Sequence, residues 1–226
     1  MMEYVVYDNP ERLVVGFGLG DQALSNAVVM TPSVRASAEE VDRAIDDVKR
    51  RHAGLKEVVV AGVGQSAIAG QTFAALSSKV DRVLLVDPEV LGYLDDERPS
   101  TCNGDYVDES CQRGSSYTFE RAQEEACPFF SNYTMSREAA SRFVGKEVTY
   151  VADENGSAPK DLSCAALVQG PAVYQRCEAY SQYMHDVHGV PWNRHRFQSV
   201  SGCRGALSCV MSQLDGTAAS QPLQHP

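Results

Sequence analysis

The sequence predicts an α/β protein with a mostly parallel sheet that is flanked by helices. Short apolar runs alternate with stretches of helical periodicity along most of the chain, which is the pattern of strands joined by helical crossovers. The 226 residues, 43% of them hydrophobic and 22% charged, can bury a sizeable core and lack the composition of a disordered chain. We therefore expect a single domain over residues 1–226, with a frayed polar tail over residues 217–226.

The expected elements follow from local signals. A capping box at Ser37 and Glu40 marks the start of the first helix, and Gly54 gives it a C-terminal stop. Apolar runs predict strands at residues 4–7, 12–15, 27–30, 57–61, 81–86 and 148–152. Further helices are expected at residues 67–77, 136–143 and 162–184, and a last helix begins near Gly202.

The charge and the apolar runs exclude several partners. A net charge of −10 without a basic stripe argues against nucleic-acid binding. The longest apolar runs are far too short to cross a bilayer, so no membrane span is expected. The chain has no C-x-x-C pair, and we expect neither a metal site nor a cofactor.

The seven cysteines favour an oxidising compartment. All lie between Cys102 and Cys209, and two glycosylation sequons at residues 132–134 and 155–157 fall in the same region. The first residues have neither the basic segment nor the long apolar segment of a signal peptide. An extracellular glycoprotein is therefore expected, while an intracellular protein and a chain lacking its leader both stay open.

The cysteine spacing predicts local disulfides. Cys102 could pair with Cys111, and Cys203 with Cys209. Cys164 and Cys177 would lie roughly 20 Å apart on one unbroken helix and could not pair unless Gly170 and Pro171 break it. Because seven is odd, at least one thiol stays free or pairs between chains.

The strand–turn–helix of residues 58–70 has three interpretations. Gly62 and Gly64 fit a dinucleotide-binding loop, with Asp87 placed as the ribose-binding acid. Ser66 fits a nucleophile elbow, in which a tight turn holds a serine above the sheet. A small-residue turn can also serve close helix–strand packing alone. A dinucleotide loop usually follows the first strand of its domain, whereas several strands precede this one, which favours the elbow.

An elbow serine requires an acid and then a histidine later in the chain. Asp153, with Glu154 as the alternative acid, follows the strand at residues 148–152. Among the five histidines, His195 has the right order and loop context. This arrangement predicts acyl transfer, in which His195 takes the proton of Ser66 and Asp153 orients the imidazole.

Several segments resemble a known family. The segments that carry the likeness are Val148-Thr149-Tyr150, Ser163-Cys164-Ala165-Ala166, Gln169-Gly170-Pro171 and the run before the elbow, Leu55 to Gly62. In these segments the chain resembles a group of α/β-hydrolase-fold proteins of fungi and bacteria, many of them secreted, and the likeness spans about residues 37–210. The resemblance implies an α/β-hydrolase-like sheet, shortened at its N-terminus.

The resemblance also implies site residues. It makes Ser66 the nucleophile and the backbone N–H of Ala67 one oxyanion donor, with Phe17 in the loop 16–18 supplying the other. Three positions depart from the family pattern, and the first is the acid, which the family places nearer Gly156 than Asp153. Ile68 replaces the second glycine of G-x-S-x-G, and Trp192 stands roughly where the family has its histidine.

These patterns together predict a serine hydrolase of esterase type that acts on a small or medium ester. Because the departures touch catalysis, a catalytically inactive binding protein with the same fold is the alternative. A Rossmann-type nucleotide-binding domain that uses Gly62, Gly64 and Asp87 is a further alternative.

Overall fold

The fold is built on one six-stranded sheet whose strands lie in chain order, β1-β2-β3-β4-β5-β6. The computed structural model describes residues 3–5, 12–17, 32–94, 136–154, 169–170, 172–203 and 206–218. The strands are β1 (Glu3–Val5), β2 (Arg12–Phe17), β3 (Glu57–Val63), β4 (Arg82–Val86), β5 (Glu147–Asp153) and β6 (His195–Val200). Only the β1–β2 pair is antiparallel, and β2 to β6 pair in parallel. The predicted α/β class is confirmed.

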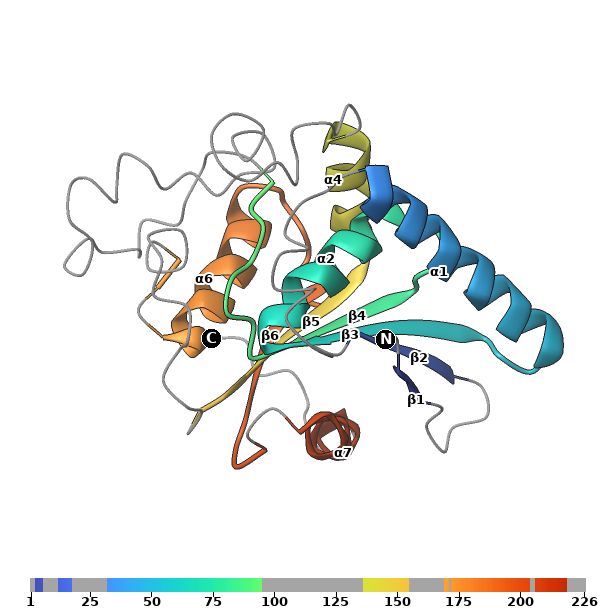
Figure 1. The fold of residues 1–226 in the computed structure, drawn as a ribbon. Coiled ribbons are helices and arrows are strands. Elements are labelled where there is room, and N and C mark those ends of the chain that lie inside the picture. Colours follow the sequence, from blue (N-terminus) through green and yellow to red (C-terminus); the bar gives the residue numbers. More distant parts are fainter. Residues whose placement is uncertain are drawn as a thin grey trace.

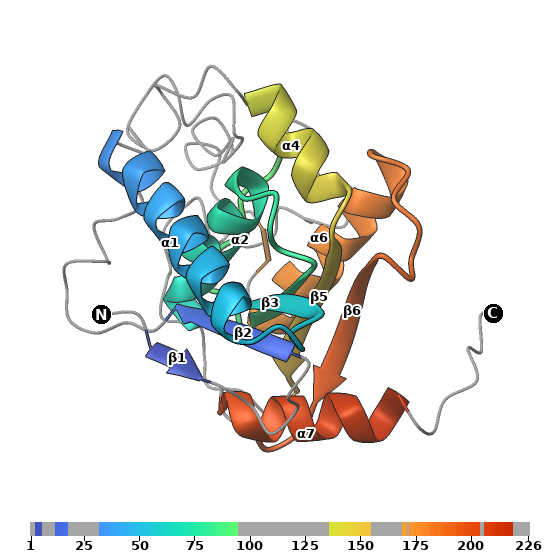
Figure 2. The ribbon, with the colours of Figure 1, turned by 90° about the vertical axis from the view of Figure 1, so that its right-hand side faces the viewer.

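Helices cover both faces of this sheet, but unequally. The helices are α1 (Pro32–Arg51), the 3-10 turn η1 (Gly64–Ser66), α2 (Ala67–Leu76), α4 (Ser136–Val144), α6 (Val173–Asp186) and α7 (Leu207–Ala218). Figures 1 and 2 show α1, α2, α4 and α6 on one face and, of the described helices, α7 alone on the other. Right-handed crossovers between strands that advance in one direction place all their helices on the same face. α7 follows the last strand and is free of that constraint.

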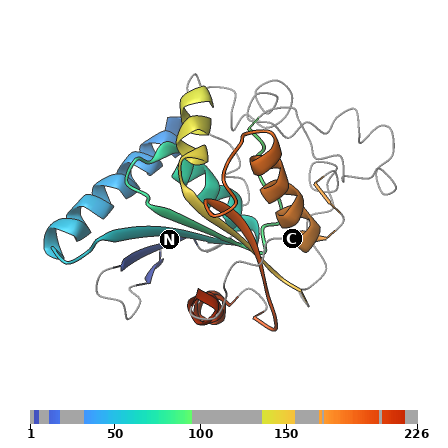
Figure 3. The same ribbon diagram turned by 180° about the vertical axis from the view of Figure 1, so that it is seen from behind.

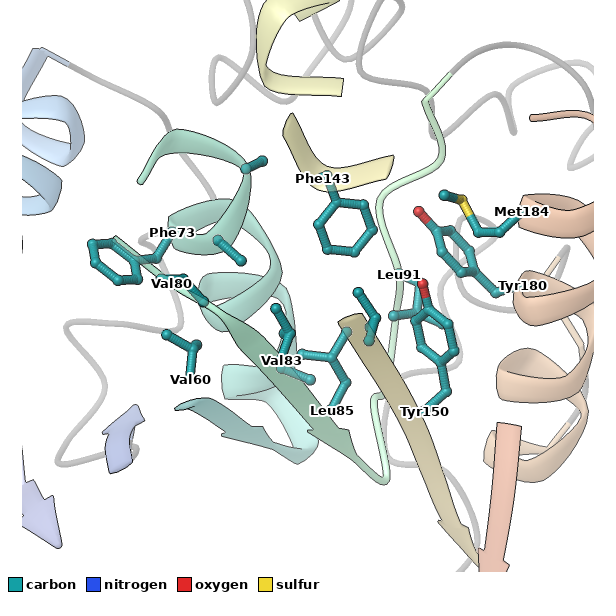
Figure 4. Packing of buried hydrophobic residues seen from close by; sticks show 14 of the residues in the cluster. Val60, Phe73, Val80, Val83, Leu85, Leu91, Phe143, Tyr150, Tyr180 and Met184 are labelled. Carbon is teal, nitrogen blue, oxygen red and sulfur yellow. The ribbon is translucent and has the colours of Figure 1, made fainter. Parts of the chain in front are cut away.

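Successive side chains of the parallel strands point alternately into two hydrophobic cores. Val58 and Val60 of β3 face α1, α2, α4 and α6, whereas Val59 and Ala61 face α7. Figure 4 shows the larger core, where Tyr150 of β5 meets α6. The smaller core joins the sheet to the loop before α7 and to α7 itself, through Leu84, Val86, Val151, Val200, Cys203, Val210 and Met211.

Two buried glutamines fix the chain after β4. Gln71 of α2 accepts a hydrogen bond from the Gly92 N–H and donates one to its carbonyl, at 2.8 and 2.9 Å. Gln169 pairs in the same way with the backbone of Leu91, both contacts being 2.8 Å. Because a buried backbone group needs a partner, these amides replace a neighbouring strand for this extended segment.

Most expected elements are present, and the corrections concern their ends. The first helix begins at Pro32 instead of Ser37, so the capping box lies inside the helix. β6 was not predicted, and it separates residues 191–193 from the final helix, which begins at Leu207 instead of near Gly202. α6 begins at Val173, and Gly170 lies before it. The expected strand at residues 27–30 and the tail beyond residue 218 lie outside the described residues.

The disulfide prediction is confirmed for one pair. Cys203 and Cys209 are bridged, with 5.4 Å between their Cα atoms. Cys177 is a buried free thiol on α6. Cys102, Cys111 and Cys164 lie outside the described residues. None of the described helices combines the length and the apolar character that a membrane span requires.

Candidate functional site

The turn between β3 and α2 has the geometry of a nucleophile elbow, and its tip is Gly64. Gly64 has φ +58°, the left-handed conformation that the strained residue of such a turn adopts. A Cβ built on Gly64 would meet no atom within 4 Å, so this position faces open space. A Cβ on Gly62 would lie 2.7 Å from the Ala67 Cα, because strand and helix approach closely there. Gly64, and not Ser66, therefore occupies the tip of the turn, where a side chain would have room.

Ser66 has a capping role in this turn. Its hydroxyl donates to the carbonyl oxygen of Val63 at 2.8 Å and accepts from the Val63 N–H at 2.9 Å. The side chain is buried and its backbone is helical, with φ −79°. Both functions of the hydroxyl are thus used to close the strand-to-helix turn, and its oxygen does not project above the sheet.

The expected oxyanion donors are placed differently from one another. The Ala67 N–H donates to the carbonyl oxygen of Gly64 and is already used inside the turn. Phe17 ends β2 beside Gly62 in the register, so its backbone does lie at the carboxyl edge next to the elbow. With Gly64 at the tip, the residue that follows it is Gln65, which is exposed. The N–H of that residue takes the place of the oxyanion donor in an elbow.

Two aspartates meet at the carboxyl ends of β4 and β5. Asp87 Oδ1 accepts a hydrogen bond from the Asp153 N–H at 2.8 Å, and Asp153 Oδ1 accepts one from the Gly202 N–H at 3.1 Å. Burial raises the pKa of Asp87 above its ordinary value of 3.8, and the nearby Asp153 and Glu89 carboxylates raise it further, partly offset by the backbone hydrogen bond. Glu154, the alternative acid, accepts from the Ser199 hydroxyl at 2.7 Å.

A buried ion pair connects this edge to α6. The fully buried Arg176 donates from Nε to the carbonyl oxygen of Gly170 at 2.8 Å and from Nη1 to the carbonyl oxygen of Glu89. Its Nη1 lies 4.0 Å from the Glu89 carboxylate. The Glu89 N–H in turn donates to the carbonyl oxygen of Gly64 at 3.4 Å. The guanidinium therefore fixes the loop that runs beside the elbow tip.

The structure does not bring His195 to Ser66 or Asp153, and this part of the expected site is corrected. His195 begins β6 and is in register with Val148, whereas Asp153 is in register with Val200 at the other end. The two positions are five residues apart along the strand, which corresponds to about 16 Å. His195 is buried between the Tyr150 hydroxyl, 2.7 Å from Nδ1, and the Phe143 carbonyl oxygen, 3.2 Å from Nε2.

The remaining described histidines also lie at the amino edge of the sheet. His52 precedes β3, and His185 and His188 precede β6. Trp192, the expected counterpart of the family's histidine, belongs to the same edge, where it stacks on His185 with 4.1 Å between ring centroids. The loop that follows β6 at the carboxyl edge is residues 201–206, and its sequence contains no histidine. His225 lies outside the described residues.

The nucleotide-binding alternative also loses support from the strand order. Rossmann-type domains bind their dinucleotide where the strand order reverses, and the order β1 to β6 has no reversal among the described strands. Asp87, the expected ribose-binding acid, uses its carboxylate on the backbone of Asp153. Within the described ranges, no group of three or more histidine, cysteine, aspartate or glutamate side chains is arranged to hold a metal ion.

The tip could have been found from the sequence. Gly62-Val63-Gly64-Gln65-Ser66 is the G-x-S-x-G pattern with glycine at the nucleophile position and serine in place of the second glycine. Within this pattern only Ser66 has a nucleophilic side chain, which favoured the serine over Gly64 as the predicted tip. The pairing of Glu89 with Arg176 had no comparable signal, because 87 residues separate the two.

Comparisons with known proteins agree with this fold. No family model matches the chain, and no curated protein matches it either. Among solved structures, it is similar to LpqC, a poly(3-hydroxybutyrate) depolymerase from Bordetella parapertussis, with a TM-score of 0.53 and 16% identity over 82% of this chain. The match spans 59% of the depolymerase chain. A candidate esterase from Staphylococcus aureus gives a TM-score of 0.42 at 9% identity, covering 99% of this chain and 84% of that one.

The likeness concerns the fold. The parallel sheet and its flanking helices resemble those of the matched depolymerase structure. At 16% identity, the similarity does not extend to residue roles, which depend on the local geometry described above. The chain is thus an α/β protein whose fold resembles that of α/β-hydrolase structures.

Proposed function

We propose that this protein is an α/β-hydrolase-fold protein that binds its ligand without forming a covalent acyl intermediate. The observation that carries the proposal is Gly64 at the tip of the elbow, with φ +58° and open space where a nucleophilic side chain would project. The retained turn with a glycine tip supports a binding site at the same edge of the sheet. The buried hydroxyl of Ser66, used by Val63, supports the same conclusion.

The ligand would lie above Gly64, between the loop that follows β4 and the end of β5. Open α/β sheets bind ligands outside the carboxyl ends of their strands. Asp87, Glu89 and Asp153 at this edge disfavour anions, so a neutral molecule with a carbonyl or ester group fits best. The exposed Gln65 next to the tip offers an amide and a backbone N–H to such a group.

Labelling with a fluorophosphonate probe tests the proposal. We expect no labelling of the folded wild type and none of Ser66→Ala. A Gly64→Ser variant serves as the matched comparison, because it places a hydroxyl at the open tip. Circular dichroism checks that each variant is folded. Labelling of the wild type that Ser66→Ala abolishes would refute the proposal. Binding itself is measured by NMR line broadening of ethyl butanoate, which we expect to weaken in Gly64→Leu.

A serine esterase that uses Ser66 is the second candidate. It is favoured by one observation, namely that Ser66 follows β3 and Asp153 ends β5, so that both lie at the same edge of the sheet. This candidate requires the hydroxyl to leave Val63 and a base other than His195. Hydrolysis of 4-nitrophenyl butyrate that survives His195→Gln but not Ser66→Ala would support it.

A further inference from the structure

The disulfide Cys203–Cys209 joins the loop after β6 to the first turns of α7. Only five residues separate the two cysteines in the chain, and the bridge lies at the margin of the smaller core. Cys203 is 3% exposed and packs on the sheet, whereas Cys209 is half-buried. An attacking thiol would therefore reach Cys209 more easily than Cys203.

The side chain of Gln213 is arranged around this bridge. Its Nε2 donates to the Cys203 Sγ at 3.2 Å and lies 3.7 Å from the Cys209 Sγ. The same amide holds the backbone of Ser201, donating to its carbonyl at 2.9 Å and accepting from its N–H at 3.2 Å. A donor beside a sulfur stabilises the thiolate that forms when the sulfur–sulfur bond breaks, and a more stable thiolate is a better leaving group.

The loop held by the bridge reaches the candidate site. The Gly202 N–H donates to Asp153 Oδ1 at 3.1 Å, and Asp153 is bonded through its own N–H to Asp87. Gly202 has φ +74°, a conformation in which the loop turns back toward β5. Figure 3 shows α7 below the carboxyl ends of the parallel strands, next to the end of β6. A change at the bridge can therefore reach the carboxylates of Asp153 and Asp87 through two hydrogen bonds.

We propose that Cys203–Cys209 is a reversible thiol–disulfide modification site whose state controls the contact of Gly202 with Asp153. A thiolate of a dithiol reductant attacks Cys209 Sγ, the Cys203–Cys209 bond breaks, and its electron pair passes to Cys203 Sγ beside Gln213. The second thiolate of the reductant then attacks the mixed disulfide and releases Cys209. Protons taken up by the two leaving thiolates balance those lost by the dithiol, which ends as a disulfide.

Reduction of the disulfide breaks the covalent link between the loop and α7. Residues 201–203 would then keep the hydrogen bonds of Gln213 and the packing of Cys203 in the smaller core as contacts with α7, without the covalent link. We expect the Gly202 amide to lose its hydrogen bond with Asp153 for a larger fraction of the time. The carboxylates beside the elbow would gain exposure, which makes the reduced and oxidised forms different binding surfaces. This inference goes beyond the proposed function and does not depend on which ligand binds there.

The first experiment measures reduction of the native protein by dithiothreitol. Samples are quenched with N-ethylmaleimide, and peptide mass spectrometry follows Cys203 and Cys209 separately from the other five cysteines. We expect reduction without loss of far-ultraviolet circular dichroism. With glutathione, a monothiol, the mixed disulfide should form on Cys209. Predominant glutathione adducts on Cys203, or reduction that occurs only as the protein unfolds, would overturn the proposal.

Gln213→Met tests the part assigned to the amide. It keeps the length of the side chain but removes the donor to Cys203 Sγ, together with both hydrogen bonds to Ser201. We expect reduction to slow about threefold to tenfold, the effect of losing one neutral hydrogen bond to the leaving sulfur. Ser212→Ala changes an exposed neighbour on α7 and should leave the rate unchanged. An equal or faster rate in Gln213→Met would show that the amide does not assist the leaving thiolate.

Hydrogen exchange tests the link to the site. We expect the Gly202 amide to exchange about tenfold faster after reduction and in the double variant Cys203→Ser/Cys209→Ser, with β4 amides unchanged. Equal exchange at Gly202 in the oxidised and reduced proteins would refute the link. Because neither measurement uses the elbow, these results are independent of the fluorophosphonate test of the proposed function.

Discussion

Gly62 of β3 and Ala67 of α2 approach so closely that a Cβ on Gly62 would lie 2.7 Å from the Ala67 Cα and 2.8 Å from the Ser66 carbonyl oxygen. Both of these neighbours are backbone atoms, which cannot move aside without displacing the start of the helix. The small residues of the turn therefore set the distance between the central strand and the helix that follows it.

Gly62→Ala should destabilise the fold by about 2–4 kcal/mol because the added methyl group overlaps backbone. Gly70→Ala is the matched control. Its Cβ would have its nearest neighbours at 3.5 Å, so we expect a change within about 1 kcal/mol, in the stabilising direction. Urea denaturation followed by circular dichroism measures both. Equal stabilities of the two variants would contradict the close approach.

Stability should rise with pH between about 4 and 6.5 because of His195. Burial lowers the pKa of His195 from 6.5 to about 4, so the unfolded chain takes up a proton first as the pH falls. The loss is complete near pH 4 and is on the order of 3 kcal/mol. The free energy of unfolding of His195→Gln should lack this slope, whereas His185→Gln, at an exposed position, should retain it. A wild type with no slope in this window would disprove the assignment.

Asp87 should tolerate asparagine and not alanine. Asparagine keeps an acceptor for the Asp153 N–H and accepts the left-handed backbone of this position, φ +46°. Alanine leaves that N–H without its partner and strains the turn, which together should cost about 2–4 kcal/mol.

The pH dependence of the same pair gives a second measurement. Since burial raises the pKa of Asp87 above 3.8, the folded wild type holds its proton more tightly than the unfolded chain and loses stability as the pH rises through this range. Asp87→Asn lacks this loss. Its stability relative to the wild type should therefore increase from pH 4 upward, and a decrease would be inconsistent with a raised pKa.

Arg176→Met should be among the most destabilising substitutions, by about 3–5 kcal/mol, because it leaves the buried Glu89 carboxylate and two carbonyl oxygens without the guanidinium. Arg82→Met provides the contrast. Arg82 forms surface ion pairs with Glu57 and Glu147 at 3.3 Å, and such pairs contribute less than about 1 kcal/mol. Thermal unfolding of both variants tests the difference, and similar melting temperatures would argue against a structural role for the buried pair.

The sequence predicted most of the sheet because the signals of buried strands are local. β3, β4 and β5 are continuous apolar runs, which is the pattern of parallel strands covered on both faces. β6 was missed because His195, Arg196, Gln198 and Ser199 interrupt its apolar pattern, and only its position beside β5 makes it a strand. Because β6 occupies His195–Val200, the segment in which a catalytic histidine would be needed follows residue 200 and does not include residues 191–193.

The candidate site was less predictable than the fold. Chain order alone made Ser66, Asp153 and His195 a plausible set, but chain order does not say at which end of a strand a residue lies. His195 at the start of β6 and Asp153 at the end of β5 belong to opposite edges of the same sheet. The conformation of Gly64 and the hydroxyl of Ser66 likewise depend on backbone angles that no residue pattern states.

The position of α7 affects how the protein is made. α7 is the only described helix on its face of the sheet, and it is synthesised after all six strands. While the ribosome is still translating β6, the apolar side chains of Val59, Leu84 and Val151 have no described helix to cover them. A nascent chain at that stage exposes an apolar surface to which chaperones and neighbouring chains can bind. Once α7 has been synthesised, it covers this surface and ends the period in which the nascent chain is prone to associate with other chains.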